Sequence, residues 1–478
     1  MRQLFFIVRK EIVIAFREKL IVSLGVILLL LLGLALYAGY ISYVQQRQTI
    51  THTQQEKRQE WLNQGDKHPH IAAHYGTFVF KPKTILSLFD FGLDSYTGTS
   101  VYLEAHFQHE FMFRPAQDHS SMIRFGELSS ALVLQVLAPL LIIFLAFASF
   151  TRERESGTLK LLLSQGISLR TLVSGKVIAY SLMLGLIVWP FVVGILIISA
   201  AGIQQATIPD IALRVALLAL IYGVYLLLFI AFSVWVSLHS STGRNALLVL
   251  LTCWIFFVIL MPKTLANLSE SFYTLPSMRE FKAQIQKDKL KGLDGKTPRS
   301  VRIVNLEKEY LEKYGVDSVQ QLPFNFEGVR MQEGEEYGNK IYDHHVEKLH
   351  KIFHKQNRLS SIASLFNPYL AVQHLSMALS GTDMHTFLHF EEKVEGYRRE
   401  MVRKMNKDMA ENSRYGEFYG YKAGNDLWQK IENFTYQTPA TLDLLPQYRM
   451  EIVSLLLWGA LVLVLFNSSN RKIKPTNG

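Results

Sequence analysis

The sequence contains one cysteine in 478 residues, and only 19 % of its residues are charged. Cys253 lies inside an apolar run, so a disulfide framework, a zinc ribbon or an iron–sulfur cluster held within one chain is excluded. Soluble globular domains carry about 25 % charged residues. The low charge, together with a hydrophobic share of 49 %, argues against a purely soluble protein.

Long apolar runs account for this composition. A bilayer core of about 30 Å is crossed by ~20 helical residues at a rise of about 1.5 Å each. The run that begins at residue 20 is too long for a secretory signal peptide and is interpreted as a retained anchor. We predict an all-α polytopic membrane protein with six transmembrane helices at residues 20–43, 130–150, 173–199, 211–238, 245–261 and 449–466.

Basic residues gather in the short segments beside these spans. Fourteen Lys or Arg and four acidic residues, which together account for the whole formal net charge of +10, lie in residues 1–19, 151–176, 239–244 and 467–478. Short basic loops stay on the cytoplasmic side of a membrane. We therefore expect both termini inside, with the loops 44–129 and 262–448 outside. Because the excess charge follows the membrane, the sequence argues against nucleic-acid binding.

The segments outside the spans are predicted to be mainly helical, with few or short strands. Residues 1–19 place apolar positions at helical spacing among basic ones, which predicts an amphipathic helix in the cytoplasmic interface. A simple extension of the first span is the alternative. Asn367-Pro368 is expected to end a long helix. Helices are predicted at 45–64, 301–314, 335–366 and 390–409, strands at 77–80 and 99–107, a large exterior domain at 262–448, and a cytoplasmic tail at 467–478.

The loop 151–172, between the second and third spans, begins with the charged residues Arg152, Glu153, Arg154 and Glu155. Ser156 is predicted to cap a short helix that Gly166 ends. On this helix we expect three leucines to share one face: Leu159, Leu162 and Leu163. Carboxylates that pair with a partner's Arg or Lys, and leucines that enter its groove, would make the loop a docking segment. An ordinary interfacial loop is the alternative.

This loop resembles a known coupling segment. Residues 152–163, with Arg-Glu-x-Glu-x-Gly-Thr-Leu and a leucine triplet, followed by Gly175-Lys176, are similar to the coupling segment of ABC-2 type ABC transporter permeases, and the order of elements also matches. Gly166-Ile167 departs from the proline that many relatives carry. In the exterior part, the resemblance is to a bacterial subgroup with a large uncharacterised domain, similar to the permeases of nitrous-oxide-reductase maturation and gliding motility; it rests on Asn367-Pro368, residues 379–383, Phe390, residues 395–399 and Asn406.

The resemblance implies a permease subunit in the bacterial inner membrane, surrounded by lipids and powered by separate ABC ATPase subunits on the cytoplasmic face. ATP and Mg would be bound by those subunits, so no cofactor is expected in this chain. Two permease chains per complex are implied, either identical or paired with a related permease, and a periplasmic partner is compatible with the exterior domain. The residues placed against the ATPase are Arg152, Glu153, Glu155, Gly157, Thr158, Leu159 and Leu162.

Two other motifs are weaker indicators of function than the loop 151–172. Gly295-Lys296-Thr297 has the end of a phosphate-binding loop, but position 290 is Leu where that loop requires Gly, and no other Walker motif appears. We therefore expect the ATPase to be a different polypeptide; the resemblance implies that this chain is a permease subunit and not an enzyme, with no catalytic residues. His350 and His354, with Glu347 nearby on the same stripe, have the spacing of shared metal ligands, although a solvated helix face explains them as well and no metal site is predicted.

Ionisable residues in the spans are few and lie near their ends. Lys176 and Arg214 are long enough to reach water, and Glu451 is expected to stay wet at the interface. No series of buried carboxylates indicates a proton relay. Pro190 is expected to kink the third span.

The sequence therefore favours the transmembrane subunit of an ABC-2 type exporter. The alternative is a complex that transmits ATP-driven motion to a periplasmic or envelope partner without moving a solute. A membrane-anchored exterior enzyme is disfavoured, because no nucleophile–base set is recognisable.

Overall fold

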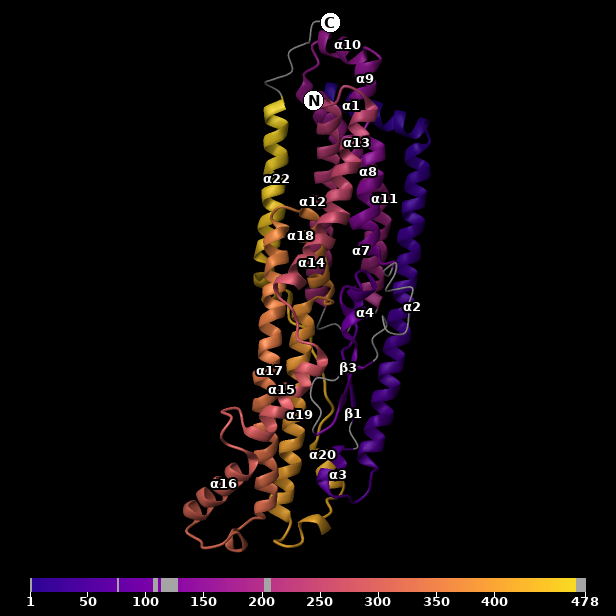
Figure 1. Ribbon diagram of the computed structural model, residues 1–478. Coiled ribbons are helices and arrows are strands. Elements are labelled where there is room, and N and C mark those ends of the chain that lie inside the picture. Colours follow the sequence, from indigo (N-terminus) through magenta and orange to yellow (C-terminus); the bar gives the residue numbers. More distant parts are fainter. Residues whose placement is uncertain (1, 75–76, 106–110, 113–127, 202–207, 470–478) are drawn as a thin grey trace.

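The computed structural model describes residues 2–74, 77–105, 111–112, 128–201 and 208–469. It is an elongated helical bundle in which apolar spans fill one half and polar helices with a small sheet fill the other (Figure 1). The end at which α1 begins and α22 ends is called the terminal end below. The half that lies beyond the spans, at the opposite end, is called the extramembrane domain.

Six helices of the described chain are long and apolar enough to cross a membrane, as predicted, so this is an all-α polytopic membrane protein. A helix satisfies its own backbone hydrogen bonds, which is what lipid requires. The spans are formed by α2 (Leu20–Leu62), α7 (Ser130–Leu132) with η2 (Val133–Leu137) and α8 (Ala138–Ala146), α11 (Leu169–Ala201), α12 (Ile208–His239), α13 (Gly243–Trp254) with η4 (Ile255–Leu260) and α14 (Met261–Phe272), and α22 (Arg449–Ser469).

The first span continues far beyond the membrane. α2 is one helix of 43 residues, about 65 Å long at 1.5 Å per residue, and this confirms the predicted helical continuation through 45–64. Its last turn is fixed to the extramembrane domain, because the Trp61 indole N–H donates to the carbonyl of Trp428 at 3.1 Å and the two rings meet edge to face. One continuous helix therefore connects the first membrane span with the extramembrane domain.

Spans two and five contain π-helical turns, η2 and η4. A π turn displaces backbone carbonyls from regular helical bonding, and such turns occur often at functional sites. Side chains from neighbouring elements bond these carbonyls. Tyr225 donates to the carbonyl of Gln135 at 2.8 Å, Trp254 to that of Val136 at 3.2 Å, and Asn367 to that of Phe257 at 2.7 Å. Pro190, where we expected the kink, lies inside α11, which continues to Ala201.

A helix that the sequence placed in the exterior domain is packed into the span bundle. α18 (Pro368–Ser380) has ten buried residues among its 13, and it packs against α12 and α22 (Figure 1). Its leucines belong to the same hydrophobic core as the spans. Asn367 starts α18 by accepting the N–H of Tyr369 at 3.0 Å, and α17 ends just before it at Ser364, which confirms the predicted break at Asn367-Pro368.

The extramembrane domain is mainly helical, as predicted. Its longest helices, α17 (Phe326–Ser364) and α19 (Met384–Asn412), lie side by side and extend the predicted ranges toward their N-termini. The remaining helices of this domain are α3 (Pro69–His74), η1 (Ile85–Leu88), α4 (Asp94–Thr97), α15 (Met278–Lys291), α16 (Arg299–Tyr314), η5 (Val319–Gln321), η6 (Phe418–Gly420), α20 (Asn425–Lys430), α21 (Thr441–Leu444) and η7 (Leu445–Tyr448).

A small antiparallel sheet of order β1-β2-β3 lies on α19. β1 (Thr77–Phe80) matches its predicted range, whereas β2 (Ser100–Leu103) is shorter than predicted and the expected residues 106–107 lie outside the described chain; β3 is Phe111–Met112. Phe78 pairs with Tyr102 in the register. The alternate side chains Val79, Val101 and Leu103 are buried against Phe390 and Val394 of α19.

The contact between α17 and α19 requires a glycine. A Cβ atom at Gly328 would lie 2.7 Å from the backbone nitrogen of Ala410, whereas a Cβ at Gly338, ten residues along the same helix, would meet nothing within 4 Å. We expect Gly328→Ala to destabilise the chain by about 1–3 kcal/mol through overpacking. Gly338→Ala should stabilise it by about 0.5–1 kcal/mol. Thermal unfolding of both variants in detergent checks this pair, and equal shifts in Tm would contradict the packing argument.

Candidate functional site

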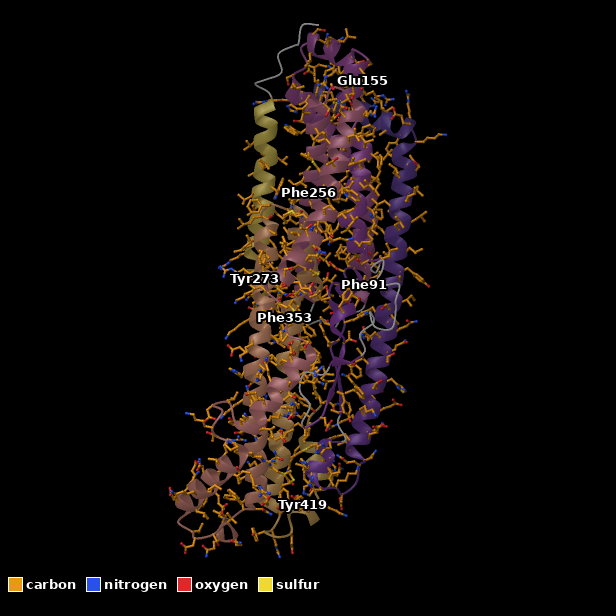
Figure 2. The ribbon with its side chains drawn as sticks, in the orientation of Figure 1. Phe91, Glu155, Phe256, Tyr273, Phe353 and Tyr419 are labelled. Carbon is orange, nitrogen blue, oxygen red and sulfur yellow. The ribbon has the colours of Figure 1, made fainter. Side chains whose placement is uncertain are left out.

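The segment singled out by the sequence forms two short helices at the terminal end, α9 (Thr151–Glu155) and α10 (Thr158–Ser164). In Figure 2, Glu155 marks this end, the farthest from the extramembrane domain. Gly157 separates the helices with a φ of +75°, a left-handed conformation that favours glycine. The predicted cap was wrong: Ser156 follows the end of α9, and the residue before α10 is Gly157, which has no capping side chain. Gly166 follows α10 with a φ of +79°.

Glu153 of α9 lies in a buried ionic cluster. The Lys176 ammonium is 2.7 Å from Glu11 and 3.0 Å from Glu153, and Lys10 also pairs with Glu153. The cluster joins α1 (Arg2–Arg17), α9 and α11 with two charges of each sign. Burial lowers the pKa of Lys10, but Glu153 and Glu11 outweigh this effect, so its pKa is raised above the ordinary value.

Two residues of this cluster, Lys176 and Glu153, are buried although the sequence predicted otherwise. Lys176 was expected to reach water, but it is 1 % exposed and its charge is neutralised inside the protein. Glu153 was expected to face an ATPase, but it is buried and its carboxylate is committed to lysines of its own chain. Sequence reasoning missed the cluster because its partners come from three separate helices.

The other charged residues of α9 each bind a different helix. Arg152 pairs with Glu18, at the turn between α1 and α2. Arg154 donates to the carbonyls of Leu238 and Ser240 at the end of α12. The Glu155 carboxylate accepts the backbone N–H of Gly243, at the start of α13, at 3.0 Å. The positive charge of Arg154 lies at the C-terminus of α12, and the negative charge of Glu155 lies at the N-terminus of α13. Both placements are favourable, because the C-terminus of a helix is partly negative and the N-terminus partly positive.

α1 packs against α11 at close range. A Cβ at Gly175 would approach Cγ2 of Ile7 to 2.5 Å, so the small residue lets the two helices touch. α1 is a separate helix from α2, with a turn at Lys19 whose φ is +58°. Its outer face exposes Phe5, Phe6 and Phe16. These features favour an interfacial helix over an extension of the first span.

The leucines of α10 divide between two faces. Leu159 is buried and Leu162 packs partly buried against the core of the same chain. Leu161 is 63 % exposed and Leu163 is 39 % exposed. Leu159, Leu162 and Leu163 have the spacing of one side of α10, but this side packs against the chain itself, and Leu163 lies at its exposed edge. The leucines of α10 that remain exposed are Leu161 and Leu163, which lie two positions apart and therefore on different sides of the helix.

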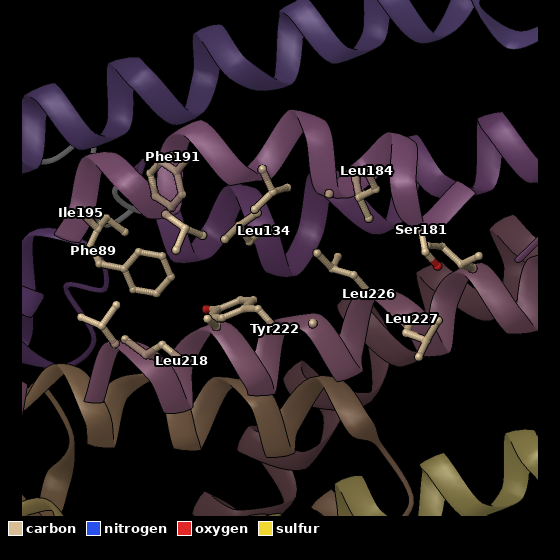
Figure 3. Close-up of a pocket in the computed structure, with 17 residues that line it drawn as sticks. Phe89, Leu134, Ser181, Leu184, Phe191, Ile195, Leu218, Tyr222, Leu226 and Leu227 are labelled. Carbon is tan, nitrogen blue, oxygen red and sulfur yellow. The ribbon is translucent and has the colours of Figure 1, made fainter. Parts of the chain in front are cut away.

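A second candidate site is an apolar cavity of about 300 Å³ between α11 and α12. Figure 3 shows Phe89 and Leu134 closing it beside Phe191 and Leu218. Its few polar groups include the hydroxyl of Tyr222 and that of Ser181, and the latter is buried without a hydrogen-bond partner in the described chain. Sequence patterns gave no sign of this cavity, because it depends on how two spans meet.

A chain of hydrogen bonds leads from this cavity to a buried acid. Gln135 donates to Tyr222 at 2.8 Å, the hydroxyls of Tyr222 and Ser376 lie 2.8 Å apart, and Ser376 donates to Asp90 at 2.6 Å. Asp90 forms no salt bridge within the described chain. Burial raises its pKa to about 6, although hydrogen bonds from Ser376 and from the N–H of Gly92 act in the opposite direction.

Two residues expected to reach water at the membrane surface are buried. Arg214 is 5 % exposed and Glu451 is 0 % exposed. The Arg214 guanidinium lies 2.8 Å from Asp210 and donates to the carbonyl of Leu379 at 3.2 Å. Glu451 accepts a hydrogen bond from Ser361 at 2.6 Å and lies 2.9 Å from His374. The expectation failed because α18 and the end of α17 cover this edge of the bundle.

His350, His354 and Glu347, whose spacing resembles that of shared metal ligands, have separate surroundings in the structure. His350 lies 3.1 Å from Glu391, Glu347 pairs with Lys351, and His354 is exposed. Within the described residues, no three His, Cys, Asp or Glu side chains are grouped to hold a metal ion. Nε2 of His70 and Nε2 of His74 lie 3.1 Å apart.

The exterior residues that carry the family resemblance hold the domain together. Arg398 of α19 is 1 % exposed and bonds Glu395 as well as Asn339 of α17. Asn406 donates to Gln332 at 2.9 Å. Asp383 accepts N–H groups at the start of α19. These contacts explain the residue types by packing and capping.

A family described as a domain of unknown function (DUF3526) matches residues 278–437. The match covers about a third of the chain, from α15 through α20, and includes α18 within the span bundle. The search of the curated proteins found no match.

Proposed function

We propose that this chain is the transmembrane subunit of an ABC-2 type ABC transporter in a bacterial inner membrane, and that it is an exporter. A separate ATPase would dock on α9 and α10, with the terminal end in the cytoplasm and the extramembrane domain in the periplasm. The chain itself would hold no ATP and catalyse no reaction. The observation that carries the proposal is the set of contacts made by the four charged residues of α9.

Through these contacts, α9 connects several helices of the membrane bundle. Residues 152–155 bind, in order, the turn after α1, the cluster of α1 and α11, the end of α12 and the start of α13. Charge-assisted hydrogen bonds are among the strong ones in proteins. A force applied to α10 therefore acts on several helices together, as coupling to an ATPase requires.

The docking surface that we propose differs in part from the sequence expectation. Leu161, with the exposed Lys160 beside it, replaces Leu159 and Leu162 as the side chain that enters the partner's groove. Gly157 and Thr158 stay at the edge of this surface, half-buried. Arg152 and Glu155 are exposed while bonded within the chain, so they can contact the ATPase and the spans at once.

The proposal is tested by Leu161→Asp. A carboxylate buried without a partner costs several kcal/mol, so the affinity for the ATPase subunit should fall by about 100-fold or more. Because Leu161 is exposed, membrane abundance should not change. The measurement is co-purification of the ATPase with the tagged chain.

Ser241→Asp is the matched control, since it adds the same charge to an exposed loop at the same end of the molecule. The control should retain the ATPase. If Leu161→Asp retains it too, α10 is an ordinary interfacial loop and the proposed docking surface is wrong.

A second function is favoured by α2 and is kept as the alternative. The continuous helix from Leu20 to Leu62 can transmit movement from the membrane to the far end of the extramembrane domain without any solute being moved. Reconstitution in vesicles separates the two functions. ATP-dependent movement of a solute supports export, whereas ATP-dependent change at the far end, with no solute moved across a broad panel, supports mechanotransmission to a periplasmic partner.

A further inference from the structure

A cleft of about 670 Å³ lies in the extramembrane domain between α15, α16 and α17. α16 lies at the end of the domain far from the spans, whereas α17 runs from there back to the span bundle (Figure 1). His70 of α3 contributes to the lining from another part of the chain. The cleft is separate from α9 and α10 and from the cavity between α11 and α12.

The floor of the cleft is bare helix backbone. Gly334 and Gly338 lie four residues apart on α17, so they share one face of that helix. A Cβ at Gly338 would meet nothing within 4 Å, and one at Gly334 would meet only the end of the Arg299 side chain, at 3.8 Å. A ligand can therefore approach the helix closely along this face.

Two tyrosines and two cations form the walls. The Arg302 guanidinium lies 3.4 Å from the centre of the Tyr337 ring, and the Lys289 ammonium lies 5.1 Å from that of Tyr342. Arg302 is also bonded to Glu333 at 2.8 Å. Cation–π contacts and this ion pair hold the walls in one arrangement before any ligand arrives.

Positive charge in the cleft is incompletely neutralised. Lys289 and Arg299 form no salt bridge with the described residues, while Glu335 supplies the negative charge of the lining. Burial lowers the pKa of Lys289, an effect to which Arg398 adds and which Glu335 opposes. A half-buried ammonium without a carboxylate in contact gains a partner when an anion binds.

We propose that this cleft binds a small organic anion, with Lys289 and Arg299 receiving its acidic group and a ring or apolar part lying over the glycine floor. Met331 and Ile341, which also line the cleft, supply apolar contact for that part. The site rests on the extramembrane residues alone, so it goes beyond the proposed coupling to an ATPase and does not depend on it.

Ligand-observed NMR titration of the full chain in nanodiscs tests the proposal. Phenyl phosphate and benzoate are the anionic probes, and benzyl alcohol is the neutral probe of similar size. We expect saturable binding of an anionic probe and none of the alcohol. Comparison of phenyl phosphate with benzoate shows whether the site prefers a phosphate or a carboxylate group.

Two variants locate the binding. Lys289→Gln should weaken it by about tenfold or more, because a charge-assisted contact is lost. Gly338→Leu should abolish it, since the new side chain enters open space in the cleft and need not disturb the fold. Lys287→Gln, exposed on the same helix as Lys289, and Gly396→Leu, an open helical glycine on α19, are the matched controls and should bind as the unaltered chain does.

The proposal is overturned if neither anionic probe binds saturably at millimolar concentration, or if Gly338→Leu binds as well as its control. Unaltered thermal unfolding of Gly338→Leu excludes a failure to fold as the cause of lost binding. Loss of anion binding with the ATPase still attached would separate this site from the coupling segment.

Discussion

Lys176→Met should destabilise the chain by about 3–5 kcal/mol, because the carboxylates of Glu11 and Glu153 would stay buried after losing the cation that lies between them. The methionine side chain is similar in length, so a cavity contributes little to this loss. Only Lys10, at the edge of the cluster and less buried, would remain as a counter-charge. The effect should be measured as a lower Tm of the detergent-solubilised protein.

The variant Lys176→Met with Glu153→Gln removes one charge of each sign and leaves Lys10 beside Glu11. We expect it to recover more than half of the lost stability, since the uncompensated charge is gone. Lys160→Met is the matched control: the same change at an exposed residue of α10 should shift stability by less than about 0.5 kcal/mol. Equal losses for the single and double variants would show that packing, not charge, holds this cluster together.

The second large effect concerns Asp90 and pH. The folded-state pKa of Asp90 is about 6, against an ordinary value of 3.8. A raised carboxyl pKa means that the folded chain holds its proton more tightly than the unfolded chain, so this contribution to stability is complete below pH 3.8 and is lost as pH rises through about 6. At one pKa unit per 1.36 kcal/mol, the loss is about 3 kcal/mol by neutral pH.

Asp90→Asn should remove this dependence, because an amide keeps hydrogen-bonding groups near Ser376 and Gly92 without ionising. The nearby charges are those of Asp94, which raises the Asp90 pKa and is paired with Lys81, and the phenols of Tyr222 and Tyr369 are uncharged at these pH values. Tm measured from pH 4 to pH 7 should fall more steeply for the unaltered chain than for the variant, by about 3 kcal/mol of free energy across the range.

Asp426→Asn, an exposed substitution of the same kind, is the control and should leave the pH profile of the unaltered chain in place. Infrared spectroscopy offers an independent readout, because a protonated carboxylic acid has its own carbonyl band. If Asp90→Asn and the unaltered chain have the same profile, Asp90 is ionised throughout and the hydrogen-bond chain to Tyr222 does not depend on its proton.

The sequence predicted those features that depend on local chemistry. Apolar runs indicated the number of spans, Asn367-Pro368 indicated the end of α17, and a short run of β-branched and aromatic residues indicated β1. α18 was misplaced because its 13 residues are too few for a span and include Gln373 and His374. Nothing within such a segment indicates that spans will cover it.

The candidate site was predicted in place but not in detail. The charge density of residues 152–155 pointed to α9, yet the roles of those charges depend on partners far away in the chain: Lys10 is 143 residues from Glu153, and Gly243 is 88 residues from Glu155. Leu159 and Leu162 of α10 face the core of the same chain, which no local pattern indicates, and the exposed Leu161 takes their place on the proposed docking surface. Asp90 and the anion cleft had no local pattern, because each is formed by elements that meet only in the folded chain.

The insertion of α18 among the spans sets an order of assembly. Tyr222 of α12 bonds a residue that is synthesised 154 positions later, and Arg214 bonds carbonyls that come 165 and 225 positions later. When the first five spans enter the membrane, the polar groups of Tyr222 and Arg214 therefore do not yet have these partners. In the orientation that we propose, the bundle is completed only after the extramembrane segment has crossed the bilayer and α18 has packed among the spans, so translocation of that segment would be a step in building the membrane core.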